Sequence, residues 1–134
     1  DIPLFVRLSA LDWVEGGVTV EDSAKTARAV KELGVDLVDA SSGGLVPADI
    51  PLGPGYQVFA AEHIRAAAGV ATGAVGLITD PLEADRIVRE GRADVVSVAR
   101  QGLRDPAFGL RAAHELGAAA SSAWQPQYER AVWA

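Results

Sequence analysis

Short apolar runs alternate along the chain with longer segments in which apolar residues recur every three or four positions. The runs cover residues 4–9, 35–40, 71–76 and 94–98. They show little alternation between apolar and polar positions, and the last is rich in β-branched residues, which predicts buried strands. Because the segments between them have helical spacing, the chain repeats strand, loop and helix about four times. This order is typical of parallel strands joined by right-handed crossovers.

Capping residues and glycines predict the limits of the helices. Thr19 resembles the start of a capping box, and Asp80 precedes a proline at the first helical position. Glycines follow the segments as helix stops. We expect helices from Thr19 to Gly34, over residues 56–68, and from Asp80 to Gly91. The positions of the first helix that should face the core are Ala24, Ala27, Val30 and Leu33.

The chain length sets the architecture that these units can form. A (β/α)₈ barrel needs about 250 residues, whereas this chain has 134. The sequence therefore predicts an α/β fold that forms half of a (β/α)₈ barrel, with about four β/α units over residues 1–117. The strand ends should lie on one rim, where barrel active sites are found; they carry Arg7, Ser41-Ser42-Gly43, Gly76 and Ala99-Arg100.

The segment after the fourth expected strand carries the clearest chemistry. Ala99 and Arg100 end that strand, and Asp105-Pro106 is expected to cap a helix over residues 106–116. A buried strand that brings an arginine and free backbone N–H groups to a strand-to-helix turn makes an anion site. We interpret this turn as a phosphate-binding corner. The alternative is an Arg100 side chain paired with a local carboxylate such as Asp105.

Arg7 lies inside the first expected strand. A buried arginine needs a carboxylate, a phosphate or another polar ligand. The residues alone leave two interpretations open, a ligand contact and an ion pair across the sheet.

Charge and composition exclude several classes of function. The net charge of −6 argues against nucleic acid as a partner. The chain has no cysteine, so disulfides and thiolate metal sites are excluded. With two histidines, His63 and His114, both in helical context, we expect no metal centre. No apolar run reaches the roughly 20 residues of a membrane span and no signal peptide opens the chain, so we expect a cytoplasmic protein without a membrane partner. The start at Asp1, without methionine, suggests a fragment or a processed chain.

The last segment, residues 118–134, has no clear period. It contains Trp124, Tyr128, Arg130 and Trp133. Aromatic residues and arginine are typical of protein interfaces, so we expect a C-terminal tail that contacts another subunit. The alternative is a tail that folds back on its own domain.

Several motifs together resemble the C-terminal half of the old yellow enzymes, which are flavin-dependent ene-reductases built on a (β/α)₈ barrel. The similarity is greatest to the bacterial subgroup with the YqjM-type and thermophilic-like enzymes, and it covers nearly the whole chain in family order. The motifs are residues 3–10 (PLFVRLSA), 34–44 (GVDLVDASSGG), 54–57 (PGYQ), 72–78 (TGAVGLI), 92–94 (RAD) and 127–130 (QYER).

The resemblance implies roles for five residues. Arg7 would contact the flavin and favour negative charge on its reduced form. Gly76, Ala99 and Arg100 would hold the FMN phosphate through backbone N–H groups and a guanidinium, although the family usually has glycine at position 99. Arg130 would reach into the active site of a neighbouring subunit, on the substrate side, although Ala131 stands where the family usually has glycine.

The resemblance also implies a reaction and its partners. NADPH or NADH would reduce FMN, and the flavin would reduce the activated C=C bond of an α,β-unsaturated carbonyl or nitro compound. The family's substrate-binding histidine pair and proton-donating tyrosine belong to the N-terminal half. That half, in the same or a separate chain, and a homo-oligomer are therefore the expected partners. Two alternatives remain: a non-catalytic half-barrel that associates with a complementary half or with itself, and another phosphate-binding barrel such as a sugar-phosphate isomerase.

Overall fold

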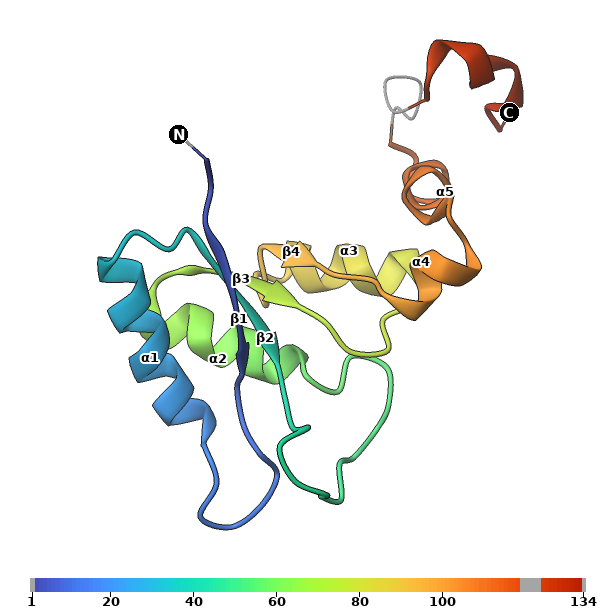
Figure 1. Ribbon diagram of the computed structural model, residues 1–134. Coiled ribbons are helices and arrows are strands. Elements are labelled where there is room, and N and C mark those ends of the chain that lie inside the picture. The colour runs from blue at the N-terminus through green and yellow to red at the C-terminus, as the bar shows by residue number, and fades with distance from the viewer. Residues whose placement is uncertain (1, 119–123, 134) are drawn as a thin grey trace.

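The structure, a computed structural model, describes residues 2–118 and 124–133 of the chain. One parallel sheet has the order β1-β2-β3-β4, formed by β1 (Phe5–Ser9), β2 (Leu37–Ser41), β3 (Ala71–Ala74) and β4 (Val95–Val96). The first three strands are followed by α1 (Val20–Glu32), α2 (Val58–Ala68) and α3 (Pro81–Arg89). Helices α1 and α2 pack side by side against the sheet (Figure 1). Neighbours in sequence are therefore neighbours in the sheet, which confirms the predicted half-barrel.

The core lies between the sheet and its helices and is built largely from alanine and valine. The largest fully buried apolar side chains are Ile64, Ile87, Val38 and Val58. Small side chains such as Ala24, Ala27, Ala60 and Ala61 let the helix backbones approach one another and the sheet closely. Both predicted caps are present, since Thr19 and Asp22 form a capping box and Asp80 accepts from the Leu82 N–H.

The first strand is not buried as expected. Residues of β1 alternate between exposed and half-buried, and Phe5 is 60% exposed. The reason is its position, because β1 pairs only with β2 and forms an edge of the sheet. Leu33, expected in the core, is also exposed, since it lies beyond the last turn of α1 as its C-cap.

The chain after β4 differs from the predicted helix over residues 106–116. Two helices form, α4 (Arg100–Arg104) and α5 (Phe108–Glu115). Asp105 does not cap the second helix; it ends α4, and its carboxylate accepts from Arg111 Nε at 2.7 Å. The predicted fourth strand is also shorter than residues 94–98. An ion pair on the α5 side therefore prevails over the capping role that the Asp-Pro pair suggested.

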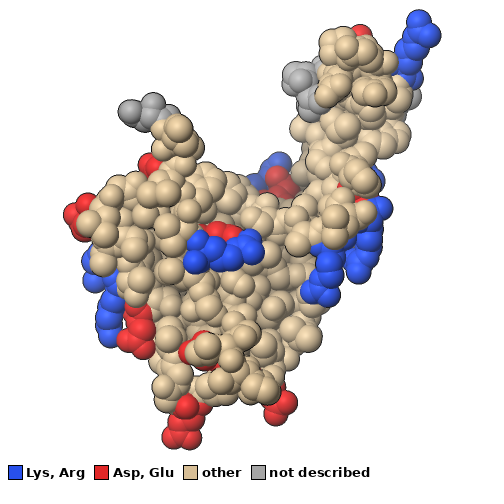
Figure 2. Space-filling view, viewed as in Figure 1, with Lys and Arg blue, Asp and Glu red and all other residues tan. Residues whose placement is uncertain are grey.

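The described part of the tail stands away from the sheet and its helices (Figures 1 and 2). It contains a 3₁₀ helix, η2 (Pro126–Ala131). Trp133 joins it to α5, because its ring centroid lies 5.4 Å from that of His114 and 5.4 Å from that of Trp124. Residues 119–123 of the expected tail lie outside the described residues. Within the described ranges, no helix has the length and apolar character needed to cross a membrane.

Candidate functional site

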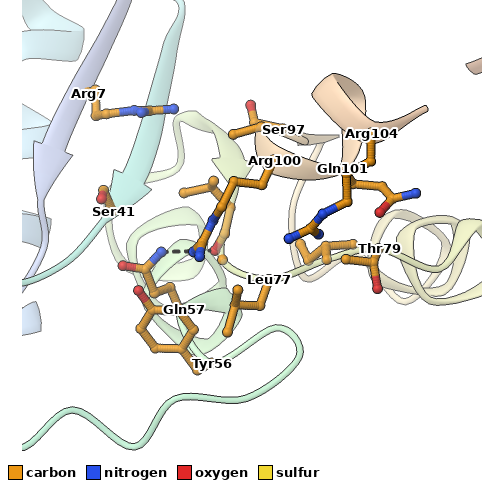
Figure 3. A pocket seen from close by; sticks show the side chains of 14 residues that line it. Arg7, Ser41, Tyr56, Gln57, Leu77, Thr79, Ser97, Arg100, Gln101 and Arg104 are labelled. Atoms are coloured by element: carbon orange, nitrogen blue, oxygen red, sulfur yellow. Dashed lines mark hydrogen bonds between the residues drawn. The ribbon is translucent and has the colours of Figure 1, made fainter. Parts of the chain in front are cut away.

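A cavity of about 150 Å³ opens at the carboxyl ends of the strands. The four predicted cofactor residues, Arg7, Gly76, Ala99 and Arg100, all line it (Figure 3). The remaining lining residues are Ser41, Tyr56, Gln57, Val75, Leu77, Ile78, Thr79, Ser97, Gln101 and Arg104. The lining contains three arginines and no acidic residue, so the cavity suits an anion.

Gly76 forms a tight backbone turn at this cavity. It has φ +124°, and an added Cβ would lie 2.9 Å from Gln57 Nε2 and 3.0 Å from Tyr56 Cε1. Its carbonyl accepts from the Gly55 N–H at 2.8 Å. In the described part of the chain, the N–H groups of Gly76 and Ala99 donate no hydrogen bond. Both N–H groups are therefore free to donate at the cavity.

Arg100 and Arg104 extend from α4 on the side of the cavity opposite Arg7 (Figure 3). They are one helical turn apart, so both side chains can share one face of α4. Neither forms an ion pair with a carboxylate of the described residues. The proposed pairing of Arg100 with Asp105 is wrong, since Asp105 binds Arg111 instead.

Arg7 forms the ion pair that the sequence left as an alternative. It faces Asp39 across β1 and β2, and its guanidinium lies 2.5 Å from Asp39 Oδ2. The Arg7 side chain is 58% exposed and that of Asp39 is 14% exposed, so the expectation of a buried Arg7 is wrong. Figure 2 shows positive and negative groups meeting near the middle of the face that carries β1. The remaining donors of the guanidinium can serve a ligand, because Arg7 also lines the cavity.

A chain of hydrogen bonds between half-buried and buried polar groups leads to the cavity lining. Trp13 Nε1 donates to Ser42 Oγ at 2.9 Å, and Ser42 Oγ donates to Gln57 Oε1 at 2.6 Å. Gln57 Nε2 then donates to the Val75 carbonyl at 3.1 Å. Gln57 is 3% exposed. This network ties three loops together at the point where β3 ends.

Sequence reasoning assigned no role to several residues that line the cavity. Tyr56 and Gln57 belong to a motif of the resemblance, but they were placed only at the start of a helix. Arg104 was missed because α4 was not predicted, although its spacing of four residues from Arg100 was a helical signal. Thr79 and Ser97 carry no signal in the sequence beyond their positions near strand ends.

The other candidate residues lie away from the cavity. Arg130 is exposed on η2 and is not among the lining residues. His63 lies on α2 and His114 on α5, as expected. Among the described residues, no group of three or more histidine or acidic side chains could hold a metal ion.

An ion pair with three hydrogen bonds to one carboxylate lies near the starts of the strands, away from the cavity. Arg65 donates two hydrogen bonds to Asp94, at 3.0 and 3.1 Å, and the Thr72 N–H donates a third at 2.8 Å. The hydrogen bond from Arg65 lowers the pKa of Asp94, and the Thr72 N–H lowers it further against partial burial. In barrels this end contributes stability rather than chemistry.

Comparison with known proteins places the chain in a family. The model of the NADH:flavin oxidoreductase / NADH oxidase family matches residues 1–118. The chain is 55% identical over 130 residues to an NADPH dehydrogenase of Geobacillus sp. and 50% identical over 130 residues to one of Bacillus subtilis. Each match covers 97% of this chain and 38% of the relative, so the chain spans well under half the length of these relatives.

A solved structure gives the same result at the level of the fold. A 2-naphthoyl-CoA reductase, in complex with 2-naphthoyl-CoA, superposes with a TM-score of 0.73 and 26% identity. The match covers 88% of this chain and 18% of that one. These findings confirm the resemblance to the old yellow enzymes. The chain belongs to the NADH:flavin oxidoreductase / NADH oxidase family.

Proposed function

We propose that this chain supplies the cofactor-phosphate grip of an FMN-dependent NAD(P)H ene-reductase. The observation that carries the proposal is the composition of the cavity, with three arginines, no acidic side chain and free backbone donors that include Gly76 and Ala99. Hydrogen bonds from cations and N–H groups to phosphate oxygens are among the stronger ones in proteins. Family membership supports a flavin as the molecule that carries this phosphate.

The size of the cavity fits part of FMN. Sites that enclose a drug-sized ligand have volumes of about 300–1,000 Å³, whereas this cavity has about 150 Å³. It therefore suits a phosphate group and leaves the rest of the cofactor on the open rim beside Arg7. The turn at Gly76 has no room for a side chain, because a Cβ there would lie 2.9 Å from Gln57 Nε2 and 3.0 Å from Tyr56 Cε1, so its backbone lines the cavity directly.

Arg7 and the phosphate grip would have different tasks. Bound FMN supplies hydride transfer between NADPH or NADH and the alkene. Gly76, Ala99 and Arg100 would bind and orient the cofactor through its phosphate. Arg7, already aligned by Asp39, would place positive charge beside the flavin ring system and favour its anionic reduced form. A substrate-side proton donor is expected from the N-terminal half, in the same or a separate chain.

Arg130 completes the proposal through oligomerisation. Its position on an exposed 3₁₀ helix, away from the sheet, supports a residue that reaches a neighbouring subunit. There it would contact the small-molecule substrate, an α,β-unsaturated carbonyl or nitro compound. The protein would then be an obligatory homo-oligomer for catalysis.

Arg100→Ala tests the phosphate grip. In the complete protein, we expect FMN binding to weaken by about 1.5–3 kcal/mol, because a charge-assisted hydrogen bond is lost. The measurement is the FMN dissociation constant from the flavin visible spectrum. Arg89→Ala is the matched control, since Arg89 lies on α3, does not line the cavity and pairs with Asp85 among the described residues. An unchanged FMN affinity in Arg100→Ala would contradict the assignment.

One observation favours the second candidate, a non-catalytic half-barrel that associates with a complementary half or with itself. The edge strand β1 and the residues before it expose apolar side chains, with Ile2 93%, Leu4 52% and Phe5 60% exposed. Unpaired edges of this kind promote association. Intact-mass analysis and a visible spectrum of the undenatured protein separate the two functions. A yellow sample supports the reductase, and a colourless sample with this chain alone supports the half-barrel.

A further inference from the structure

We infer that Gln57 is a positioning residue that sets the Val75-Gly76 turn for anion binding. This inference rests on the proposed phosphate site. It concerns a residue that does not itself need to touch the ligand through its side chain, because its amide is already engaged on both sides.

The hydrogen bonds of Gln57 fix the direction of the turn. Gln57 Nε2 holds the Val75 carbonyl, which belongs to the same peptide unit as the Gly76 N–H. Because a peptide unit is planar and trans, fixing the carbonyl also fixes the N–H, which points the opposite way. The Gly76 N–H is one of the free donors at the cavity. Gln57 therefore orients a donor that the anion would use.

The rest of the network orients Gln57 itself. Its Oε1 accepts from Ser42 Oγ, which accepts in turn from Trp13 Nε1. An amide must present its oxygen to a donor and its nitrogen to an acceptor, and these partners define one orientation. Burial of Gln57 at 3% exposure makes the loss of either bond costly.

Contacts on the other side leave the turn little freedom. The Gly76 carbonyl accepts from Gly55, and an added Cβ at Gly76 would lie 2.9 Å from Gln57 Nε2. Gln57 thus occupies the space that a side chain at position 76 would take. The left-handed backbone of Gly76 and the amide of Gln57 therefore stabilise the same conformation of the Val75-Gly76 turn.

The test compares amide signals in the isotope-labelled chain during titration with FMN and, separately, with inorganic phosphate. In the unsubstituted chain, both ligands should shift the amide signals of Gly76 and Ala99. In Gln57→Leu we expect the FMN dissociation constant to rise about tenfold. The Gly76 response should be lost while the Ala99 response persists, which a general loss of structure would not produce.

Two further variants complete the test. Gln125→Leu makes the same chemical change at an exposed position of the tail and should bind as the unsubstituted chain does. Ser42→Ala removes the hydroxyl that donates to Gln57 Oε1 and accepts from Trp13 Nε1, and it should weaken FMN binding about threefold. It decides the question if Gln57→Leu fails to fold.

Two results would overturn the inference, and a third would remove its basis. In a folded Gln57→Leu or Ser42→Ala chain, an unchanged dissociation constant, or equal loss of the Gly76 and Ala99 responses, would exclude a positioning role. If neither ligand shifts these signals in the unsubstituted chain, the proposed phosphate site fails, and the inference fails with it.

Discussion

Asp39 binds Arg7 through one carboxylate oxygen while its other oxygen, Oδ1, is buried without a hydrogen-bond partner among the described residues. The two side chains lie at paired positions of β1 and β2. An added Cβ at Gly73 on β3 would lie 3.0 Å from Asp39 Oδ1. Asp39 is therefore enclosed on the β3 side, and Arg7 is the group that balances its charge.

This relationship predicts a non-additive pair of substitutions. Arg7→Leu should lower the free energy of unfolding by about 1–3 kcal/mol, because Asp39 is left as a half-buried charge without a cation. Adding Asp39→Asn should restore part of that stability. Urea unfolding of the single and double variants measures the coupling. A double variant less stable than Arg7→Leu alone would contradict this account of the pair.

Gly76→Ala should disturb both folding and anion binding. The φ of +124° and the contacts of an added Cβ with Gln57 and Tyr56 predict a loss of about 1–3 kcal/mol in the free energy of unfolding. The measurement is the urea midpoint, followed by FMN titration of the folded variant. Gly53→Ala is the matched control, since a Cβ there meets nothing within 4 Å. Equal midpoints for the two variants would argue against a tight turn at Gly76.

The Arg65–Asp94 pair predicts a pH dependence of stability. The pKa of Asp94 lies below its ordinary value of 3.8 in the folded chain, first because of the hydrogen bond from Arg65. The pair therefore stabilises the fold above the ordinary pKa, and this contribution is lost as the pH falls through the lowered one.

Asp94→Asn should accordingly reduce stability by about 1 kcal/mol at pH 7, a value that allows for partial exposure. It should also flatten the loss of stability between roughly pH 5 and pH 2. Urea unfolding across this pH range provides the measurement. Asp85→Asn, which breaks an exposed pair on α3, should change stability by only about 0.3–0.5 kcal/mol. Parallel pH profiles for Asp94→Asn and the unsubstituted chain would refute the assignment.

Arg130→Ala should weaken the binding of substrate or inhibitor without emptying the flavin site. The reason is its proposed position in the neighbouring subunit, at the substrate side and away from the phosphate cavity. Inhibitor titration together with flavin content of the full-length protein tests this. Arg89→Ala serves again as the control for loss of one positive charge. A crystal structure in which Arg130 points to bulk solvent in every subunit would exclude the role.

Much of the fold could be predicted from local signals in the sequence. Thr19, Asp80 and the helix-stopping glycines act on their own neighbours, so the first three helices could be predicted within a few residues. The burial of β1 could not, because it depends on which strand lies next to it. The Asp105-Pro106 pair misled for a similar reason, since the competing partner Arg111 becomes available only once α5 has formed.

The candidate site also contains residues that local signals predict and residues that depend on tertiary structure. Arg7, Gly76, Ala99 and Arg100 follow strand ends, and the topology of parallel strands brings such positions together. The sequence predicted an ion pair across the sheet as one possible partner of Arg7, but it did not identify the residue. Asp39 is selected by the register between β1 and β2, which forms only in the folded sheet. The role of Gln57 depends on side-chain directions in three loops, which no local pattern reports.

Every group that would grip the anion directly lies between β3 and the end of α4, within residues 71–104. With Tyr56 and Gln57 just before α2, most of the cavity lining belongs to one stretch, residues 56–104, and only Arg7 and Ser41 of the lining come from earlier in the chain. A graft of this anion site onto another barrel would therefore need a longer cassette that includes Ser42, because Ser42 holds Gln57. Redesign of the N-terminal half of the barrel could then change the reaction, while the cassette keeps the same cofactor-phosphate site.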